Sequence, residues 1–275
     1  MTRLRALVAG GAALLATTVL APTPAQAGDP NWTLGGAPCT IGVGTAAPPV
    51  GTGTCPGVRP GAIVNSDVGQ CTFNFLFRGS DGNRYMGTAG HCILGESPVG
   101  GDVGERSWAA GSGPVATDAD GNRVGEFAYA ILQDPKDFAL IRLDPGVQAS
   151  PQMCHFGGPT GRNDALVQEP VVLHHFGQGL LLGETIPART HVALSMPNPN
   201  HVYANGLAIF GDSGSGVIDD AGRAIGVLVT IGVHTAEIGT TTDAGTIGIT
   251  RLGPQQQRAG QVLGIRLKLV TAPLL

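Results

Sequence analysis

Three short segments of the chain carry side chains that could together turn a serine hydroxyl into a nucleophile. Residues 88–92 read TAGHC and contain His91, an apolar stretch begins at Asp137, and the glycine-rich residues 211–216 surround Ser213. A serine hydroxyl is a weak nucleophile until a nearby base takes its proton, which an imidazole can do near neutral pH. A carboxylate on the other ring nitrogen fixes the tautomer and stabilises the protonated ring. The residue types therefore predict Ser213 as nucleophile, His91 as general base and Asp137 as the group that orients it.

The glycines around Ser213 predict how the transition state would be stabilised. Gly211 and Ser213 can direct their backbone N–H groups at one point, because glycine lets the chain turn tightly and approach a substrate. Each such donor contributes about 2.7–4 kcal/mol to the stability of a developing oxyanion. Each of the three segments alone is common in turns and strand ends, so the prediction depends on their occurrence together. This chemistry requires no metal ion and no organic cofactor.

The composition excludes several other classes of protein. Of the 275 residues, 42% are hydrophobic and 13% are charged, with 20 acidic against 16 basic side chains. This balance argues against a nucleic-acid-binding protein with a basic face, and the hydrophobic content is sufficient to fill a core. The 44 glycines and 20 prolines follow no collagen period, so they indicate many turns and short strands.

The pattern along the chain predicts an all-β fold. Alternating segments at 72–78 and 84–88 are separated by the sequence Ser-Asp-Gly-Asn, which is typical of a hairpin turn. Similar turns recur at 118–122 and 219–222. Many short strands with regular turns indicate a β-barrel or a β-sandwich.

Two strand-rich halves are separated by a segment rich in proline and glycine at residues 149–164. We therefore expect a first β-barrel over residues 61–148 and a second over residues 165–275, packed against each other. Within the second half, residues 253–261 predict one short helix, and residues 264–270 predict a final strand.

The N-terminus has the pattern of a secretory signal peptide. Arg3 and Arg5 precede an apolar stretch, and an Ala-Gln-Ala cleavage site ends residues 1–27. Residues 28–60 are rich in glycine, proline and threonine and are expected to be irregular. Removal of the signal would release a soluble extracellular protein, which we expect to be a monomer without membrane attachment. The five cysteines are then candidates for disulfides, and none lies in a C-x-x-C pair that would indicate zinc.

The sequence resembles the chymotrypsin-like (trypsin-fold) serine proteases, and within them the secreted bacterial branch that includes the streptogrisins and α-lytic protease. The similarity covers residues 60–272. Its motifs are GQC at 69–71, TAGHC at 88–92, KDFALI at 136–141 and GDSG at 211–214.

The resemblance implies a fold and a site. It implies two six-stranded antiparallel barrels, with His91 and Asp137 on the first, Ser213 on the second, and the site in the cleft between them. It also implies a disulfide between Cys71 and Cys92, and protein or peptide substrates.

The resemblance also indicates which residues would form the substrate pocket. Leu207 stands six residues before Ser213, at the usual position of the pocket floor, and Thr230, Ile231 and Gly232 correspond to the strand along one wall. None of these side chains is charged. We therefore expect a preference for an uncharged apolar side chain before the scissile bond.

Two partnerships stay open at the level of sequence. No Ile-Val-Gly-Gly-type start, whose freed amine could pair with Asp212, is evident near residues 59–62. Because an unpaired buried carboxylate is costly, we expect an arginine to pair with Asp212 instead. Among the remaining cysteines, Cys39 could pair locally with Cys55, or Cys154 could tether the N-terminal segment.

Other polar clusters favour ordinary structural roles. His174 and His175 are neighbours in a predicted strand, so they should face opposite sides of a sheet rather than share a metal. Residues 118–122 hint at a calcium loop, but the sixth position is Arg123 where such a loop has glycine, and no glutamate closes it, so a hairpin turn is favoured.

The leading hypothesis is a secreted serine endopeptidase that forms an acyl-enzyme intermediate. One alternative is a catalytically silent binding protein of the same fold, favoured if the pocket is narrowed around Leu207 or Ile231. Another is a secreted esterase that uses the same three residues.

Overall fold

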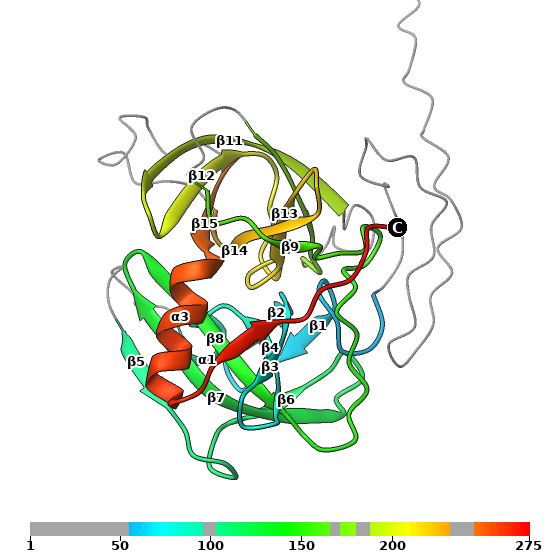
Figure 1. Cartoon of the computed structure of the whole chain (residues 1–275), viewed down its shortest axis with the longest axis vertical. Helices are drawn as coiled ribbons and strands as arrows, with labels where there is room; N and C mark the ends of the chain where they lie inside the picture. Colours follow the sequence, from blue (N-terminus) through cyan, green and yellow to red (C-terminus); the bar gives the residue numbers. More distant parts are fainter. Residues whose placement is uncertain (1–54, 96–102, 166–170, 180–187, 232–244) are drawn as a thin grey trace, which may run out of the picture.

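Short strands joined by glycine-containing turns fold into two mainly antiparallel sheets, which Figure 1 shows stacked on each other with helix α3 along one side. The architecture is that of a computed structural model, which describes residues 55–95, 103–165, 171–179, 188–231 and 245–275. The predicted signal peptide, most of residues 28–60 and Gly232 lie outside the described residues. The two β-sheets and the short C-terminal helix confirm the predicted all-β double-barrel fold class.

The first sheet is a curled half-barrel of nine strands. Its order is β16-β3-β4-β8-β7-β6-β1-β2, and β5 pairs with β7. Its strands are β1 Ile63–Asn65, β2 Gln70–Thr72, β3 Leu76–Gly79, β4 Arg84–Thr88, β5 Gly104–Ser107, β6 Val115–Thr117, β7 Arg123–Gln133, β8 Lys136–Leu143 and β16 Leu267–Leu269. Among the described strands its two ends do not pair, so this half stays open where a six-stranded barrel was predicted.

The second sheet closes into a six-stranded barrel. Its order is β13-β10-β11-β12-β15-β14, the pairing of β13 with β14 completes the ring, and β9 lies parallel to β14. Its strands are β9 Gly161–Arg162, β10 Val172–Phe176, β11 Ala188–Asn198, β12 His201–Asn205, β13 Gly216–Asp219, β14 Arg223–Ile231 and β15 Thr246–Arg251.

The C-terminal segment links the two sheets. Helix α3 (Leu252–Leu263) follows β15 and confirms the predicted short helix, and it ends at Gly264, whose left-handed φ of 67° suits glycine. The chain then forms β16, which pairs with β3 of the first sheet. The predicted hairpin also forms, because β3 and β4 pair across a turn in which Gly82 has a φ of +85°.

One disulfide lies within the first half, another joins the segment before β1 to the linker, and one close packing contact joins the two sheets. Cys71 pairs with Cys92, as the resemblance implies, and Cys55 pairs with Cys154, which decides between the two alternatives for Cys55. Cys39 lies outside the described residues. The ring of Phe75, between β2 and β3 of the first sheet, fills the space where a side chain at Gly216 of β13 would stand. The two sheets therefore pack directly against each other next to the loop that precedes β13.

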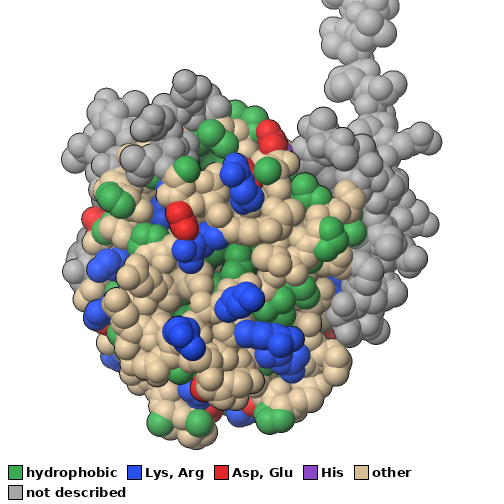
Figure 2. All heavy atoms as spheres, viewed as in Figure 1, with side chains coloured by type: hydrophobic (Ala, Val, Ile, Leu, Met, Phe, Trp, Pro, Cys, Tyr) green, Lys and Arg blue, Asp and Glu red, His purple; other side chains and the backbone are tan. Residues whose placement is uncertain are grey.

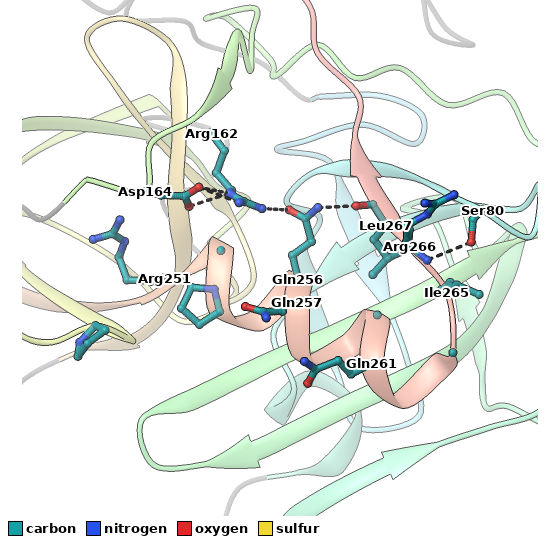
Figure 3. A pocket seen from close by; sticks show the side chains of 15 residues that line it. Ser80, Arg162, Asp164, Arg251, Gln256, Gln257, Gln261, Ile265, Arg266 and Leu267 are labelled. Atoms are coloured by element: carbon teal, nitrogen blue, oxygen red, sulfur yellow. Dashed lines mark hydrogen bonds and ion pairs between the residues drawn. The ribbon is translucent and has the colours of Figure 1, made fainter.

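Two features of the surface lie away from this contact. Lysine and arginine side chains gather around β16 on the face shown in Figure 2. Beside them, α3 and the start of β16 line a hollow of about 1040 Å³ (Figure 3), which includes none of the predicted site residues. Within the described part of the chain, no helix combines the length and the apolar character needed to cross a bilayer.

Candidate active site

His91 and Asp137 meet where β4 ends and β8 begins. The short helix α1 (His91–Leu94) starts just after β4, and Asp137 is the second residue of β8, which pairs with β4. Asp137 Oδ2 lies 2.7 Å from His91 Nδ1, and both side chains are largely buried. Because a carboxylate only accepts hydrogen bonds, the ring proton belongs on Nδ1, and Nε2 is left as the basic nitrogen.

The backbone holds the other oxygen of Asp137. Oδ1 accepts hydrogen bonds from the N–H groups of Gly90, at 2.5 Å, and of His91, at 3.0 Å. A side chain at Gly90 would overlap the carbonyl oxygen of Ile131 and crowd Asp137. The glycine of the TAGHC segment therefore lets the carboxylate approach the backbone, and three hydrogen bonds fix its orientation.

Thr72 fastens the loop that carries Ser213 to the first sheet. The N–H of Thr72 donates to the Ser213 carbonyl, and its Oγ1 donates to the Gly211 carbonyl, each at 2.8 Å. The Thr72 side chain is fully buried. Sequence reasoning missed this residue, because nothing in its type or neighbours distinguishes it from other strand threonines.

The same loop lies against the chain segment that leads to His91. A side chain at Gly214, where φ is +89°, would overlap Thr88 and press on Ala89. Ser213 on the second barrel is thereby placed beside the end of β4 on the first sheet. Ser213 is partly exposed, and within the described residues its hydroxyl makes no hydrogen bond.

The predicted oxyanion donors are free in the described part of the chain. Gly211 has a φ of +101°, which favours glycine, and neither its N–H nor that of Ser213 donates to a described acceptor. Both N–H groups are therefore without an acceptor among the described residues, as the oxyanion prediction requires.

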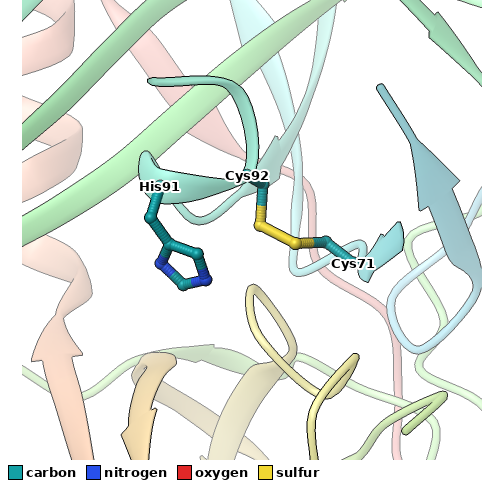
Figure 4. Close-up of side chains that lie close together, drawn as sticks. All are labelled: Cys71, His91 and Cys92. Atoms are coloured by element: carbon teal, nitrogen blue, oxygen red, sulfur yellow. A yellow bond between two sulfur atoms is a disulfide. The ribbon is translucent and has the colours of Figure 1, made fainter. Parts of the chain in front are cut away.

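A disulfide lies directly beside His91 (Figure 4). One ring nitrogen of His91 lies within 4.8 Å of a sulfur of Cys71 and of Cys92. These sulfurs are bonded to each other, so they offer no thiolate to a metal ion. In Figure 4 the yellow loop of the second barrel faces the imidazole and the disulfide, in agreement with the contact of Gly214.

Asp212 has the buried arginine partner that the sequence requires. Its carboxylate is fully buried, forms an ion pair with Arg189 of β11, and accepts a hydrogen bond from the Ile209 N–H at 2.7 Å. Burial alone would raise the pKa of Asp212, but the charge of Arg189 and the hydrogen bond from the Ile209 N–H hold its pKa below the usual value. Asp212 is therefore ionised inside the barrel, and its neighbour Ser213 is held in place.

Two histidines extend this buried network, and sequence reasoning assigned no role to their pairing. Arg189 lies opposite His175, and His191 lies two residues further along β11, on the same inner face. Arg189 Nη1 is 3.3 Å from His175 Nε2, and His175 Nδ1 is 2.5 Å from His191 Nε2, with only 8° between the ring planes. Because a guanidinium only donates, each hydrogen bond is directed from Arg189 toward His191. Burial lowers the pKa of both histidines, that of His191 to about 2.

The structure describes three of the four predicted pocket residues. Leu207 is 49% exposed and precedes Phe210, which is 72% exposed, so the loop presents two apolar side chains to solvent. Thr230 is exposed near the end of β14, and Ile231 ends that strand. Gly232, the last of the predicted wall residues, lies outside the described residues.

These features define the fold of the chymotrypsin-like serine proteases: a curled half-barrel that bears a histidine–aspartate pair, and a closed barrel whose glycine-rich serine loop docks beside it. No protein-family model matches the chain, and no curated protein does. The structure is similar to that of a glutamic acid-specific serine protease that utilises a histidine triad in substrate binding, with 15% identity, 77% of this chain and 100% of that chain covered, and a TM-score of 0.51. It is equally similar to Thermobifida fusca Protease A, with 15% identity, 78% and 99% covered, and a TM-score of 0.51.

Proposed function

We propose that the chain is a secreted serine endopeptidase. The observation that carries this proposal is the contact between His91 and Asp137, with the Ser213 loop docked against the segment that leads to His91. A carboxylate-oriented imidazole, a partly exposed serine and two free backbone donors are the parts that acyl transfer requires. The two disulfides fit an exported protein.

In the first half of the proposed reaction, Ser213 Oγ attacks the carbonyl carbon of the scissile peptide bond. His91 Nε2 accepts the hydroxyl proton, and the carbonyl oxygen becomes an oxyanion that the N–H groups of Gly211 and Ser213 stabilise. Collapse of this intermediate breaks the C–N bond, and His91 donates the proton to the leaving amine. Rotation of the Ser213 side chain supplies the contact with His91, since catalytic hydrogen bonds often form only in the substrate complex.

In the second half, water replaces the amine. His91 takes a proton from the water as its oxygen attacks the acyl carbon, and the proton passes to Ser213 Oγ as the ester bond breaks. Throughout, Asp137 stays ionised and stabilises the protonated form of His91.

The exposed apolar side chains of Leu207 and Phe210 support a preference for uncharged apolar residues before the scissile bond. The similar glutamate-specific protease provides the competing expectation, because this chain also holds paired histidines in its second barrel. A cleavage profile on a peptide library separates the two. Cleavage after Leu, Phe or Met supports the apolar pocket, whereas cleavage after Glu would refute it.

Labelling with a fluorophosphonate probe tests the catalytic proposal directly. We expect stoichiometric labelling at Ser213, its loss in Ser213→Ala and His91→Ala, and no change in the control Ser112→Ala, which removes an exposed hydroxyl elsewhere. Absence of labelling at neutral pH in the folded protein would favour a silent binding protein. Hydrolysis of a short-chain ester without hydrolysis of casein would favour an esterase.

A further inference from the structure

Four basic side chains gather on the outer face of the first sheet. Lys268 of β16 lies opposite Arg78 of β3, and Arg78 lies opposite Arg84 of β4. Directly opposed residues on antiparallel strands point to the same face, with Cβ atoms about 5 Å apart. Arg266 shares that face, because it stands two residues before Lys268. We call Arg78, Arg84, Arg266 and Lys268 the basic patch, and Figure 2 shows basic side chains grouped there.

No carboxylate neutralises the basic patch among the described residues. The described arginines that do form ion pairs all lie outside the basic patch: Arg123, Arg142, Arg162, Arg189, Arg223 and Arg258. In the turn after β3, the carboxylate of Asp81 is bound by the Tyr85 hydroxyl and the Asn83 amide. Like charges that face each other across strands are destabilising, and among the four side chains only that of Arg84 donates to a described acceptor, the Val147 carbonyl at 2.6 Å from its Nη2. An anion over the patch would therefore relieve the repulsion between these cations.

The basic patch continues into the hollow beside α3. Arg266 and Ser80 line that hollow, and the Arg266 N–H donates to Ser80 Oγ at 3.0 Å. Across the hollow lie the exposed amide side chains of Gln257 and Gln261 (Figure 3). Arg266 and the Ser80 hydroxyl on one side, the two amides on the other and the Arg162–Asp164 ion pair at one end form a strongly polar surface.

The chemistry of this surface narrows the class of ligand. None of the described residues that line the hollow is aromatic, so it offers no platform for stacked bases. The large hydrophobic side chains that are exposed elsewhere belong neither to the basic patch nor to the hollow, so no apolar anchor for a membrane or a protein interface is present in the described part of this face. A hydrophilic polyanion rich in hydroxyl groups fits these properties.

We propose that the basic patch and the hollow bind an anionic polysaccharide. The exposed guanidinium groups of Arg78 and Arg266 take its carboxylate or sulfate groups by paired hydrogen bonds. Lys268 adds a point charge, and so does the half-buried Arg84, whose Nη2 donates to the Val147 carbonyl at 2.6 Å. Ser80 and the glutamine amides take its hydroxyl groups. The whole chain has a net charge of −4, so a polyanion is not attracted to the protein surface in general. We therefore expect its attraction to come from the basic patch. The site is independent of the proposed peptidase activity.

Binding measurements with defined polymers test the proposal. We expect the protein to bind dextran sulfate or polygalacturonate with a salt-dependent affinity, and not to bind neutral dextran. Arg78→Gln and Lys268→Gln should each weaken binding at least threefold and lower the slope of log affinity against log salt by about one. The control Arg106→Gln, which removes an exposed arginine on β5 that forms no ion pair with a described residue, should change neither quantity.

Other outcomes would overturn the proposal. Equal weakening by Arg106→Gln would mean that attraction is spread over the whole surface. Tighter binding of polyglutamate or of a single-stranded oligonucleotide would mean that another class of polyanion is the ligand. The thermal midpoint of Arg78→Gln should be equal to or above that of the parent chain, because the change removes two repulsive contacts. A lower midpoint would show that the arginine has a structural role instead.

Discussion

Replacing Thr72 by valine is the sharpest test of how the nucleophile loop is positioned. The hydroxyl of Thr72 donates to the Gly211 carbonyl at 2.8 Å and accepts from the Gln178 N–H at 3.1 Å. Valine keeps the shape of the side chain but removes both hydrogen bonds inside a fully buried site. Gly211 is then free to rotate, because glycine has no Cβ to limit its backbone angles.

The size of the effect is bounded on both sides. Loss of one neutral hydrogen bond costs about 1 kcal/mol, or about fivefold in rate, whereas complete loss of one oxyanion donor costs about 10²–10³-fold in kcat. Because the loop is displaced rather than deleted, we expect kcat of Thr72→Val to fall by about 10- to 100-fold. KM should change less than twofold, since the donors of Gly211 and Ser213 act mainly on the transition state.

Steady-state kinetics on a chromogenic peptide, with burst measurements of acylation, provides the assay. Thr72→Ser should restore most of the rate, because it keeps the hydroxyl. The matched control is Thr160→Val, whose Oγ1 also donates to a loop carbonyl at 2.8 Å, that of Ala221 in the turn between β13 and β14. Full activity of Thr72→Val, or an equal loss in Thr160→Val, would refute the positioning argument.

Three further substitutions probe the same network. Asp137→Asn should lower kcat by about 10⁴-fold without unfolding the protein. The asparagine oxygen can still accept from the two backbone N–H groups that bind Oδ1, but its NH₂ group then faces His91 Nδ1 and forces the wrong tautomer of the imidazole. Asp144→Asn is the control for the loss of charge, and a fall in kcat of less than tenfold in Asp137→Asn would contradict the assignment. Arg189→Met should lower the free energy of unfolding in urea by about 3–5 kcal/mol, because it leaves a buried carboxylate unpaired. Burial lowers the pKa of His191 from 6.5 to about 2, so the unfolded chain binds a proton that the native state does not. Stability should therefore fall by up to about 1.4 kcal/mol per pH unit for this group as the pH drops below 6.5, and His191→Gln should remove that one-proton slope in urea titrations at several pH values.

Local motifs predicted the parts of the site that depend on neighbours in sequence. TAGHC places a glycine before His91, and that glycine is what allows Asp137 to reach two backbone N–H groups. The hairpin between β3 and β4 and helix α3 also follow from turn residues and short-range periodicity. In each case the physical cause lies within a few residues of the motif.

The buried network could not be predicted in the same way, because it depends on strand register. The sequence requires a cation for Asp212 but does not say which one, since Arg189 reaches it only after β10 and β11 pair. The same register brings His175 and His191 onto one inner face, although 16 residues separate them. Each histidine alone resembles an ordinary strand residue, so its role appears only once the barrel is closed.

The two kinds of contact on the nucleophile loop act from opposite sides, and together they explain how the loop is held. Arg189 draws the Asp212 carboxylate into the second barrel, while Thr72 holds the carbonyls of Gly211 and Ser213 from the first sheet. Both sets of contacts restrain the same three residues, so either loss already releases the loop. The double variant Thr72→Val/Arg189→Met should therefore lose less kcat than the product of the two single losses, whereas independent effects would multiply.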